Sequence, residues 1–294
     1  MANLKFYIVD VFAEGKYEGN QLAVVRGGSN LPDETLQKIA REMHFSETTF
    51  IIDEQPAANG GFPVRIFTPE EEIPFAGHPT LGTAFIIREK ILRQPADKIL
   101  LNLKAGQIPV DFPEDGSGVV WMTQLPPVFG EFHDALDIAK MLTLPNDAID
   151  SRFPCQTVST GTPFIIAPVK SLDAVKMAQL NRSFYFDYIK KSKAKSILFF
   201  APETYHESNQ LNARMFADFY GVPEDPATGS ANGCLAGWLV KYRFFDSEII
   251  DVRVEQGCEI HRPSLLYLKA DMAPAGINVH VGGKVVPVAE GVLV

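Results

Sequence analysis

Long apolar runs, paired cysteines and an excess of basic residues are all missing from this sequence of 294 residues. No stretch reaches the roughly eighteen consecutive apolar residues that a membrane-spanning helix needs. The first ten residues also lack the basic-then-apolar layout of a secretory signal. We therefore expect a cytoplasmic protein.

The 3 cysteines and 6 histidines are scattered through the chain, with no CxxC, HxxxH or HExxH spacing. Neither a disulfide framework nor a zinc site is predicted, and we expect reduced, mostly buried thiols and no metal. The GxGxxG, GxxxxGK[ST] and GxSxG signatures are missing as well. Nicotinamide, nucleotide and serine-hydrolase chemistry all lose support.

The formal net charge of -9 disfavours nucleic acid or an anionic membrane as a partner, because both bind basic surfaces. A small anionic substrate held by local dipoles remains possible. With 46% hydrophobic residues, a chain of this length can form two cores of ordinary size. Two domains are the starting expectation.

The first half of the chain alternates short β-branched or aromatic segments with Gly, Pro and Asp turns, which is typical of strands. Residues 6–12 and 22–25 predict a hairpin, and an amphipathic helix follows Pro32, with apolar residues at helical spacing up to Met43. Residues 81–87 predict a buried helix that ends in the charges at 88–90. Further strands are expected at 48–52, 62–68, 98–103, 108–112 and 119–124.

The prolines of Leu125-Pro126-Pro127 mark the best candidate for a domain boundary. Beyond them a second series of strands is expected, together with a helix after Gly229. Strands are expected at 163–168, 196–201, 212–219, 248–255 and 265–270.

A weak internal repeat connects the two halves. The separation is 149 residues between Arg65 and Arg214, and 152 between Gly77 and Gly229. Chance similarity and a true duplication both remain open. If the duplication is real, each of two similar domains contributes a strand-to-helix turn, and the turns face a shared cleft. The matching segments are Arg65-Ile66-Phe67, Ile73-Pro74 and Ala76-Gly77-His78-Pro79-Thr80 against Arg214-Met215-Phe216, Val222-Pro223 and Ala227-Thr228-Gly229-Ser230-Ala231.

Both turns begin a helix with small residues, Gly77-His78-Pro79 in one half and Thr228-Gly229-Ser230 in the other. Accessible N–H groups and the positive end of the helix dipole favour a bound carboxylate or phosphate. The alternative is that the glycines only permit tight turns.

Three titratable residues are candidates for proton transfer, each with a structural alternative. His78 can exchange protons near neutral pH, or it is a structural hydrogen-bonding residue. Asp225 precedes the second turn, as a proton carrier or as a cap of the helix N-terminus. Glu47 lies between a helix and an apolar strand, where it is a desolvated acid or a solvated charge. The acidic run 70–72 is expected to be a solvated loop.

With these residues assembled, the sequence resembles the PhzF-like family, named for an isomerase of phenazine biosynthesis. The resemblance runs nearly from end to end. The matching motifs are Asp10-Val11-Phe12, Glu18-Gly19-Asn20, Ala40-Arg41-Glu42-Met43, Ser46-Glu47-Thr48-Thr49-Phe50, Arg65-Ile66-Phe67-Thr68-Pro69, Pro74-Phe75-Ala76-Gly77-His78-Pro79, Glu224-Asp225-Pro226-Ala227-Thr228-Gly229-Ser230-Ala231, Gln256-Gly257 and Arg262-Pro263-Ser264.

The resemblance implies a diaminopimelate-epimerase-like α/β (α+β) fold. Two pseudo-twofold-related domains each wrap a mixed, barrel-like sheet around a central helix, with the active site in the cleft between them. The expected domains are residues 1–126, completed by 284–294, and residues 127–283.

The resemblance also implies a cofactor-independent isomerase that moves a proton between carbons of a small carboxylic acid, without a metal, and that forms a homodimer. By similarity, Glu47 is the general acid/base, while His78 and Asp225 complete the catalytic set. Substrate contacts are expected at Asn20, Ser46, Gly77, Gly229 and Ser230. Two alternatives stay open: a catalytically inactive metabolite-binding or regulatory protein of the same fold, and a hydrolase with Ser230 as its nucleophile.

Overall fold

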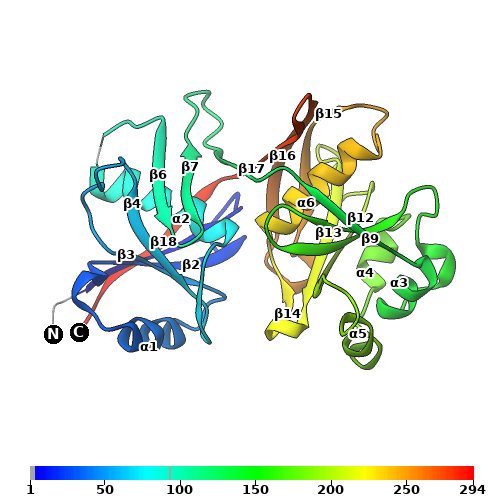
Figure 1. Cartoon of the computed structure of the whole chain (residues 1–294), viewed down its shortest axis with the longest axis horizontal. Helices are drawn as coiled ribbons and strands as arrows, with labels where there is room; N and C mark the ends of the chain where they lie inside the picture. The colour runs from blue at the N-terminus through cyan, green and yellow to red at the C-terminus, as the bar shows by residue number, and fades with distance from the viewer. Residues whose placement is uncertain (1–3, 93) are drawn as a thin grey trace. The chain divides into compact units, whose positions relative to one another are not determined.

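The structure, a computed structural model, describes residues 4–92 and 94–294. The chain divides into two compact units. The first comprises Met1–Thr123 and Gly282–Val294, and the second comprises Gln124–Val281. Figure 1 shows that each unit has a helix lying among its strands, α2 in the first and α6 in the second.

The first unit is built on a mixed sheet of six successive strands. β1 is antiparallel to β2, β2 is parallel to β3, and β3 is antiparallel to β4. β4 is parallel to β6, and β6 is antiparallel to β7. These strands are β1 (Leu4–Val11), β2 (Asn20–Arg26), β3 (Thr48–Ile51), β4 (Phe62–Phe67), β6 (Lys98–Leu103) and β7 (Gly106–Asp111).

Three further strands complete this sheet. The short β5 (Glu72–Ile73) pairs with β4, and β8 (Val120–Thr123) pairs with β7. The C-terminal strand β18 (Val285–Leu293) runs antiparallel to β1, with a register shift between Ile8 and Val9.

Helix α2 (Gly77–Ile86) is the centre of the first unit, because it packs against β1, β2, β3, β6, β7 and β8. It is apolar around most of its circumference, as a helix enclosed by a sheet must be. Gly82 permits this enclosure. A Cβ atom there would lie 2.6 Å from a methyl carbon of Leu22 and 2.9 Å from one of Val11.

Helix α1 (Asp33–Met43) covers the outer side of β3 and β4. Its apolar stripe places Leu36 and Ala40 in a small core with Phe50 and Phe67, whose rings meet edge to face at 5.4 Å. The predicted amphipathic helix is confirmed.

The second unit repeats this strand pattern. β10 is antiparallel to β11, β11 is parallel to β12, and β12 is antiparallel to β13. β13 is parallel to β15, and β15 is antiparallel to β16. These strands are β10 (Cys155–Ser159), β11 (Pro163–Pro168), β12 (Ser196–Ala201), β13 (Leu211–Ala217), β15 (Ile249–Gln256) and β16 (Ser264–Ala273).

Further elements surround this sheet. β9 (Val128–His133) pairs with β10, and the short β14 (Val222–Asp225) pairs with β13. β17 (Gly276–Gly283) follows β16. Helices α3 (Ala135–Met141) and α5 (Arg182–Ile189) pack on each other, and α4 (Leu172–Met177) packs on β12 and β13.

Helix α6 (Gly229–Lys241) is the centre of the second unit, packed against β10, β11, β12, β15 and β16. Its Trp238 is fully buried and contacts Phe153 and Phe200 edge to face and Phe244 in a tilted arrangement. This aromatic cluster is one reason that the second core holds together around a single helix.

The strand registers confirm the internal repeat. Phe50 of β3 faces Arg65 of β4, and 149 residues later Phe199 of β12 faces Arg214 of β13. Each arginine also makes a two-pronged ion pair with a glutamate of the short strand that follows. Arg65 donates to both oxygens of Glu72 at 2.9 Å, and Arg214 donates to both oxygens of Glu224 at 2.8 Å.

Three details differ from the sequence expectations. The helix expected to end at 88–90 continues as a π-helical segment, η2 (Ile87–Leu92), in which Arg88 donates to the carbonyl of Ala96 at 3.1 Å. Glu72 is not in a solvated loop, since Arg65 holds it against β4. Strands β5, β9, β10, β14 and β17 and helices α3, α4 and α5 were not predicted.

The cysteines are free thiols in the part of the chain that the structure covers, as predicted. Burial raises the pKa of Cys155 and Cys234 to about 12, so both stay protonated at neutral pH. No helix formed by residues 4–92 and 94–294 is long and apolar enough to cross a membrane.

Candidate active site

Glu47 and His78 come together in the first unit. Glu47 lies between α1 and β3, and His78 is the second residue of α2. The Oε2 atom of Glu47 is 3.5 Å from Nε2 of His78, with the two side chains 18% and 6% exposed. The acid is therefore largely withdrawn from solvent and has an imidazole as its neighbour.

His78 is a neutral imidazole at physiological pH, because burial lowers its pKa to about 3. One ring nitrogen hydrogen bonds to the backbone of Gln21, next to Asn20 at the start of β2. Nε2 has no hydrogen-bond partner in the described part of the chain, so Nδ1 makes this bond. A backbone carbonyl accepts, and so Nδ1 carries the proton and Nε2 presents a lone pair.

This tautomer determines what Glu47 can do. An ionised carboxylate and the Nε2 lone pair have no proton between them, whereas a protonated Glu47 can donate to Nε2. The pair thus accommodates one mobile proton and can exist in two states that differ by that proton. A general acid/base must alternate between two such states.

The first unit also contains three predicted substrate-binding residues, Asn20, Ser46 and Gly77. Gly77 begins α2, and no side chain caps that helix start. The Thr80 hydroxyl donates to the carbonyl of Ala76 at 2.7 Å and closes the turn. Ser46 is half-buried beside Glu47, and Asn20 is 2% exposed, opposite Val11 in the β1–β2 pair.

Asp225, Gly229 and Ser230 form the corresponding turn of the second unit. Asp225 is the last residue of β14 and is 7% exposed. Its Oδ2 accepts a hydrogen bond from the Thr228 hydroxyl. Thr228 occupies the N-cap position of α6, and its own side chain makes no capping bond. Gly229 and the half-buried Ser230 are the first two residues of α6.

Neither Gly77 nor Gly229 serves a left-handed turn, since both are helical residues at the first position of α2 and α6. Uncapped helix starts expose N–H groups that the helix itself does not use. Such groups and the helix dipole favour an anion.

Sequence reasoning missed the residues that hold the second turn. Gln256, at the end of β15, is fully buried and bonds to Asp225, Thr228 and Asn232. Asn232 also donates to the carbonyl of Thr228 at 3.0 Å, as Thr80 does to Ala76 in the first unit. The sequence identified Gln256-Gly257 only as one motif of the family pattern and assigned it no role.

The repeat shows that the titratable groups are not duplicated. By the register offset of β3 and β12, Ser196 occupies the position of Glu47. By the 152-residue offset of the two turns, Ser230 corresponds to His78. Ile73 corresponds to Asp225, because Ile73 pairs with Ile66 and Asp225 pairs with Met215, so the sequence match of Ile73-Pro74 with Val222-Pro223 was out of register by three residues. Among residues 4–92 and 94–294, the Glu–His pair therefore occurs in only one of the two similar halves.

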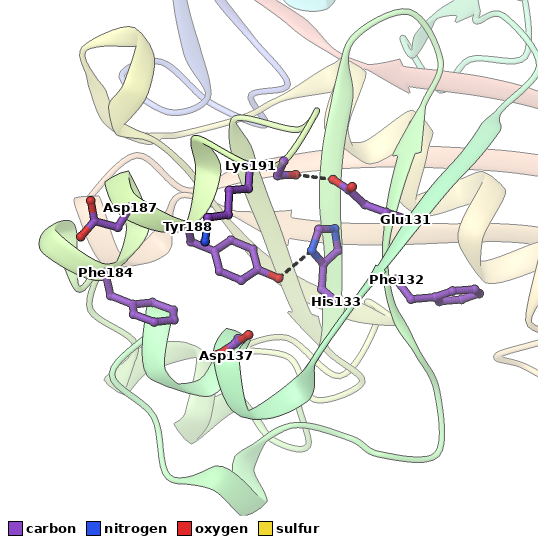
Figure 2. A pocket seen from close by; sticks show the side chains of 9 residues that line it. Glu131, Phe132, His133, Asp137, Phe184, Asp187, Tyr188 and Lys191 are labelled. Atoms are coloured by element: carbon purple, nitrogen blue, oxygen red, sulfur yellow. Dashed lines mark hydrogen bonds between the residues drawn. The ribbon is translucent and has the colours of Figure 1, made fainter.

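A separate pocket of about 430 Å³ lies in the second unit, lined by residues of β9, α3, α5 and the segment after α5. Figure 2 shows the side chains that line it. No predicted site residue lines it. Its polar groups bind one another, since His133 bonds to Tyr188 at 2.9 Å and to Thr157 at 2.8 Å. Glu131 accepts from Ser192 at 2.6 Å. The imidazole of His133 and the carboxylate of Glu131 are thus already hydrogen-bonded within the second unit.

Within residues 4–92 and 94–294, no three His, Cys, Asp or Glu side chains gather as ligands for a metal ion.

Solved structures place the fold in a known class. A PhzF-family phenazine biosynthesis protein from Bacillus anthracis superimposes with a TM-score of 0.91 at 28% identity, covering 100% of both chains. A predicted epimerase from Pseudomonas aeruginosa gives a TM-score of 0.81 at 31% identity over 99% of both chains. The predicted mixed α/β, epimerase-like fold of two similar halves is confirmed.

The sequence leads to the family itself. Residues 9–291 match the family described as phenazine biosynthesis-like protein, PhzC-PhzF. The chain is also 32% identical over 290 residues to the trans-2,3-dihydro-3-hydroxyanthranilate isomerase of Pseudomonas aeruginosa, with 98% of each protein covered. The chain belongs to this family and is an enzyme of the isomerase class.

Proposed function

We propose that this isomerase moves a proton between two carbons of a small carboxylic acid, with Glu47 as the only general acid/base and no cofactor. The observation that carries the proposal is the buried Glu47–His78 pair, which accommodates one proton. Glu47 removes a proton from an activated carbon and becomes a carboxylic acid. It then delivers a proton to a second carbon, after exchange with solvent where that is fast enough, and is ionised again, so the proton count balances without a co-reactant.

The asymmetry of the two halves supports the single base. A two-base reaction needs an acid or base at each face of the reacting carbon, and a duplicated fold offers an obvious way to build that pair. Here Ser196 stands where the second glutamate would be. One carboxyl group that both takes and returns the proton accounts for a site with only one Glu–His pair.

His78 supports this cycle because its neutral ring is compatible with both the ionised and the protonated form of Glu47. When Glu47 holds the proton, Nε2 of His78 accepts a hydrogen bond from it and stabilises the acid in a buried place. The neutral imidazole adds no positive charge that would keep Glu47 ionised. The carboxyl group can therefore both gain and release a proton.

Polar groups at the helix starts are proposed to bind the substrate. Backbone amides at Gly77 and Gly229 stabilise negative charge that develops when the proton leaves carbon. Asp225 and Ser230 orient polar substituents, with Asn20 and Ser46 as further contacts. The relatives' names make trans-2,3-dihydro-3-hydroxyanthranilate the first compound to test, as a small cyclic amino acid with an activated C–H bond.

Replacing Glu47 by Gln tests the assignment directly. Glutamine keeps the shape of the side chain but cannot cycle a proton, and general acid/base catalysis contributes about 10²–10⁴-fold. We expect turnover of trans-2,3-dihydro-3-hydroxyanthranilate to fall by at least that range. The control is Glu54→Gln, which removes a carboxylate that pairs with Arg26 outside the site. Full turnover by Glu47→Gln would exclude Glu47 as the base.

Cofactor independence has its own test. The proposed cycle uses only groups of this chain, so extensive dialysis and EDTA are expected to leave turnover within about twofold of the untreated enzyme. Loss of activity that a divalent metal restores would contradict this part of the proposal.

A further inference from the structure

Gln256 is the most extensively bonded side chain around the second turn. It is the last residue of β15 and has no exposed surface. Its Nε2 donates to the carbonyl of Asp225 at 2.8 Å and to the Thr228 hydroxyl at 3.2 Å. Its Oε1 accepts from the Thr228 amide at 3.3 Å and from Asn232 at 2.8 Å.

These four bonds join the two sides of the turn. Asp225 ends β14, whereas Thr228 and Asn232 belong to the start of α6. The segment between them contains Pro226 and Ala227 and has no regular secondary structure. A single amide group therefore fixes the separation between the end of the strand and the first turn of the helix.

The chain behind Gln256 leaves this amide little freedom. Gly257 has a positive φ of 77°, and a Cβ atom there would lie 2.6 Å from the carbonyl oxygen of Pro226. The backbone after Gln256 thus packs directly on the turn that the side chain holds. A side chain with one conformation and four satisfied bonds is well suited to positioning its neighbours.

We propose that Gln256 is a positioning residue that aims the Asp225 carboxyl group and the α6 amides at the substrate. It acts through the turn from Asp225 to Gly229 and not by touching the reacting atoms. The expected effect of Gln256 on turnover rests on the proposed function, whereas its expected effect on amide exchange in the turn does not.

The essential element is the amide donor of Gln256. In Gln256→Glu, one carboxylate oxygen can still accept hydrogen bonds from the Thr228 amide and from Asn232, but a second oxygen replaces Nε2. That oxygen faces the carbonyl of Asp225, which is also an acceptor, so the bond at 2.8 Å becomes a repulsive contact. Gln256→Met removes the same donor without adding charge.

Gln156 provides a matched control in the same unit. It is 3% exposed, its Nε2 donates to the carbonyl of Gly130 at 2.9 Å, and its Oε1 accepts from Tyr242 at 2.5 Å. Gln156→Glu therefore changes a buried donor of the same kind without touching the turn.

The first measurement is amide hydrogen exchange of the full-length protein without ligand. We expect Gln256→Glu and Gln256→Met to accelerate exchange within residues 226–232 by about tenfold, because opening the turn becomes easier. Gln156→Glu should leave that segment unchanged and accelerate exchange near residue 130. Unchanged exchange within 226–232 in both Gln256 variants would overturn the inference.

The second measurement is a double-mutant cycle on turnover of trans-2,3-dihydro-3-hydroxyanthranilate. A 1 Å displacement of a positioned group can cost about 10²-fold, so Gln256→Glu is expected to lower kcat/KM by about 10- to 100-fold. If Gln256 acts through Asp225, its effect nearly disappears in an Asp225→Asn background, whereas that of Gln156→Glu does not change. Fully additive effects of Gln256→Glu and Asp225→Asn would overturn the positioning role.

The two proposals fail in different ways. If the natural enzyme shows no turnover that depends on Glu47, the proposed function fails, while amide exchange still decides whether Gln256 holds the turn.

Discussion

At the residue scale, the chemistry of the proposed site depends on how deeply His78 is buried. An exposed histidine would be partly charged near pH 6.5 and would hold Glu47 as a carboxylate. Burial instead keeps the ring neutral, and the bond to Gln21 assigns its proton to Nδ1. The sequence identified both residues as candidates, but only the structure gives their separation and this tautomer.

His78 should also make the stability of the protein depend on pH. The unfolded chain takes up a proton at a histidine pKa of about 6.5, whereas the folded protein does so only near 3. The unfolded state therefore binds more protons between these values, and stability is lost as the pH falls. The expected loss is at most about 1.4 kcal/mol per pH unit.

Urea unfolding between pH 7.5 and 4.5 measures this dependence. His78→Gln removes the titrating group, so its unfolding free energy should vary less steeply with pH over this range. His206→Gln, which changes an exposed histidine, is the control and should retain the natural slope. Equal slopes in all three proteins would show that His78 is accessible to protons in the folded state.

At the element scale, the two turns are supported by equivalent arginines in different surroundings. The Arg214 side chain is 9% exposed and that of Glu224 is 10% exposed, against 27% and 22% for Arg65 and Glu72. Arg214 also donates to two backbone carbonyls, those of Val175 and Ala178. Removing one partner of a buried pair leaves the other charge unpaired, which costs far more than at the surface.

Leucine substitutions should distinguish the buried Arg214–Glu224 pair from the more exposed Arg65–Glu72 pair. Arg214→Leu is expected to destabilise the second unit by about 3–5 kcal/mol, and Arg65→Leu to destabilise the first by about 1–2 kcal/mol. The 2 tryptophans allow each unit to be followed, because Trp121 belongs to the first and Trp238 to the second. Urea titrations in Trp121→Phe and Trp238→Phe backgrounds report the two transitions. Similar losses in both units would contradict the burial argument.

The elements also show how far sequence reasoning reaches. Strands with dense β-branched and aromatic residues, such as β11 and β12, were predicted at their observed bounds. Helix α5 was missed because its residues Arg182–Ile189 are rich in aromatics and lack a clear apolar stripe. β9 was missed because most of its residues are exposed. Its pairing with β10 depends on a distant segment that no local pattern reveals.

At the scale of the whole molecule, the internal repeat accounts for the similar folds of the two halves. It does not reveal every residue that supports the proposed site. The Arg–Phe register and the Arg–Glu pairs recur in both halves, each beside a strand-to-helix turn. Sequence spacing was enough to find the repeated arginines, but not the glutamates that pair with them, since Glu72 was expected in a solvated loop. The buried amide of Gln256 was not identified as a site residue, since its four partners come together only when β15 lies beside the turn.

The asymmetry between the halves carries the central claim, that one carboxyl group both removes and returns the proton. Glu47 has Ser196 as its counterpart, so no second glutamate is available at the equivalent place. A single base exchanges its proton with solvent only while it holds that proton. Label from heavy water should therefore enter the substrate at carbon through Glu47 alone.

The most direct measurement is deuterium incorporation from heavy water into trans-2,3-dihydro-3-hydroxyanthranilate and related small carboxylic acids, followed by NMR. The natural enzyme and Glu54→Gln are expected to place deuterium at carbon, and Glu47→Gln is expected to place none above the uncatalysed rate. Carbon-bound deuterium that accumulates equally fast with Glu47→Gln would contradict the account, because another group would then be moving the proton.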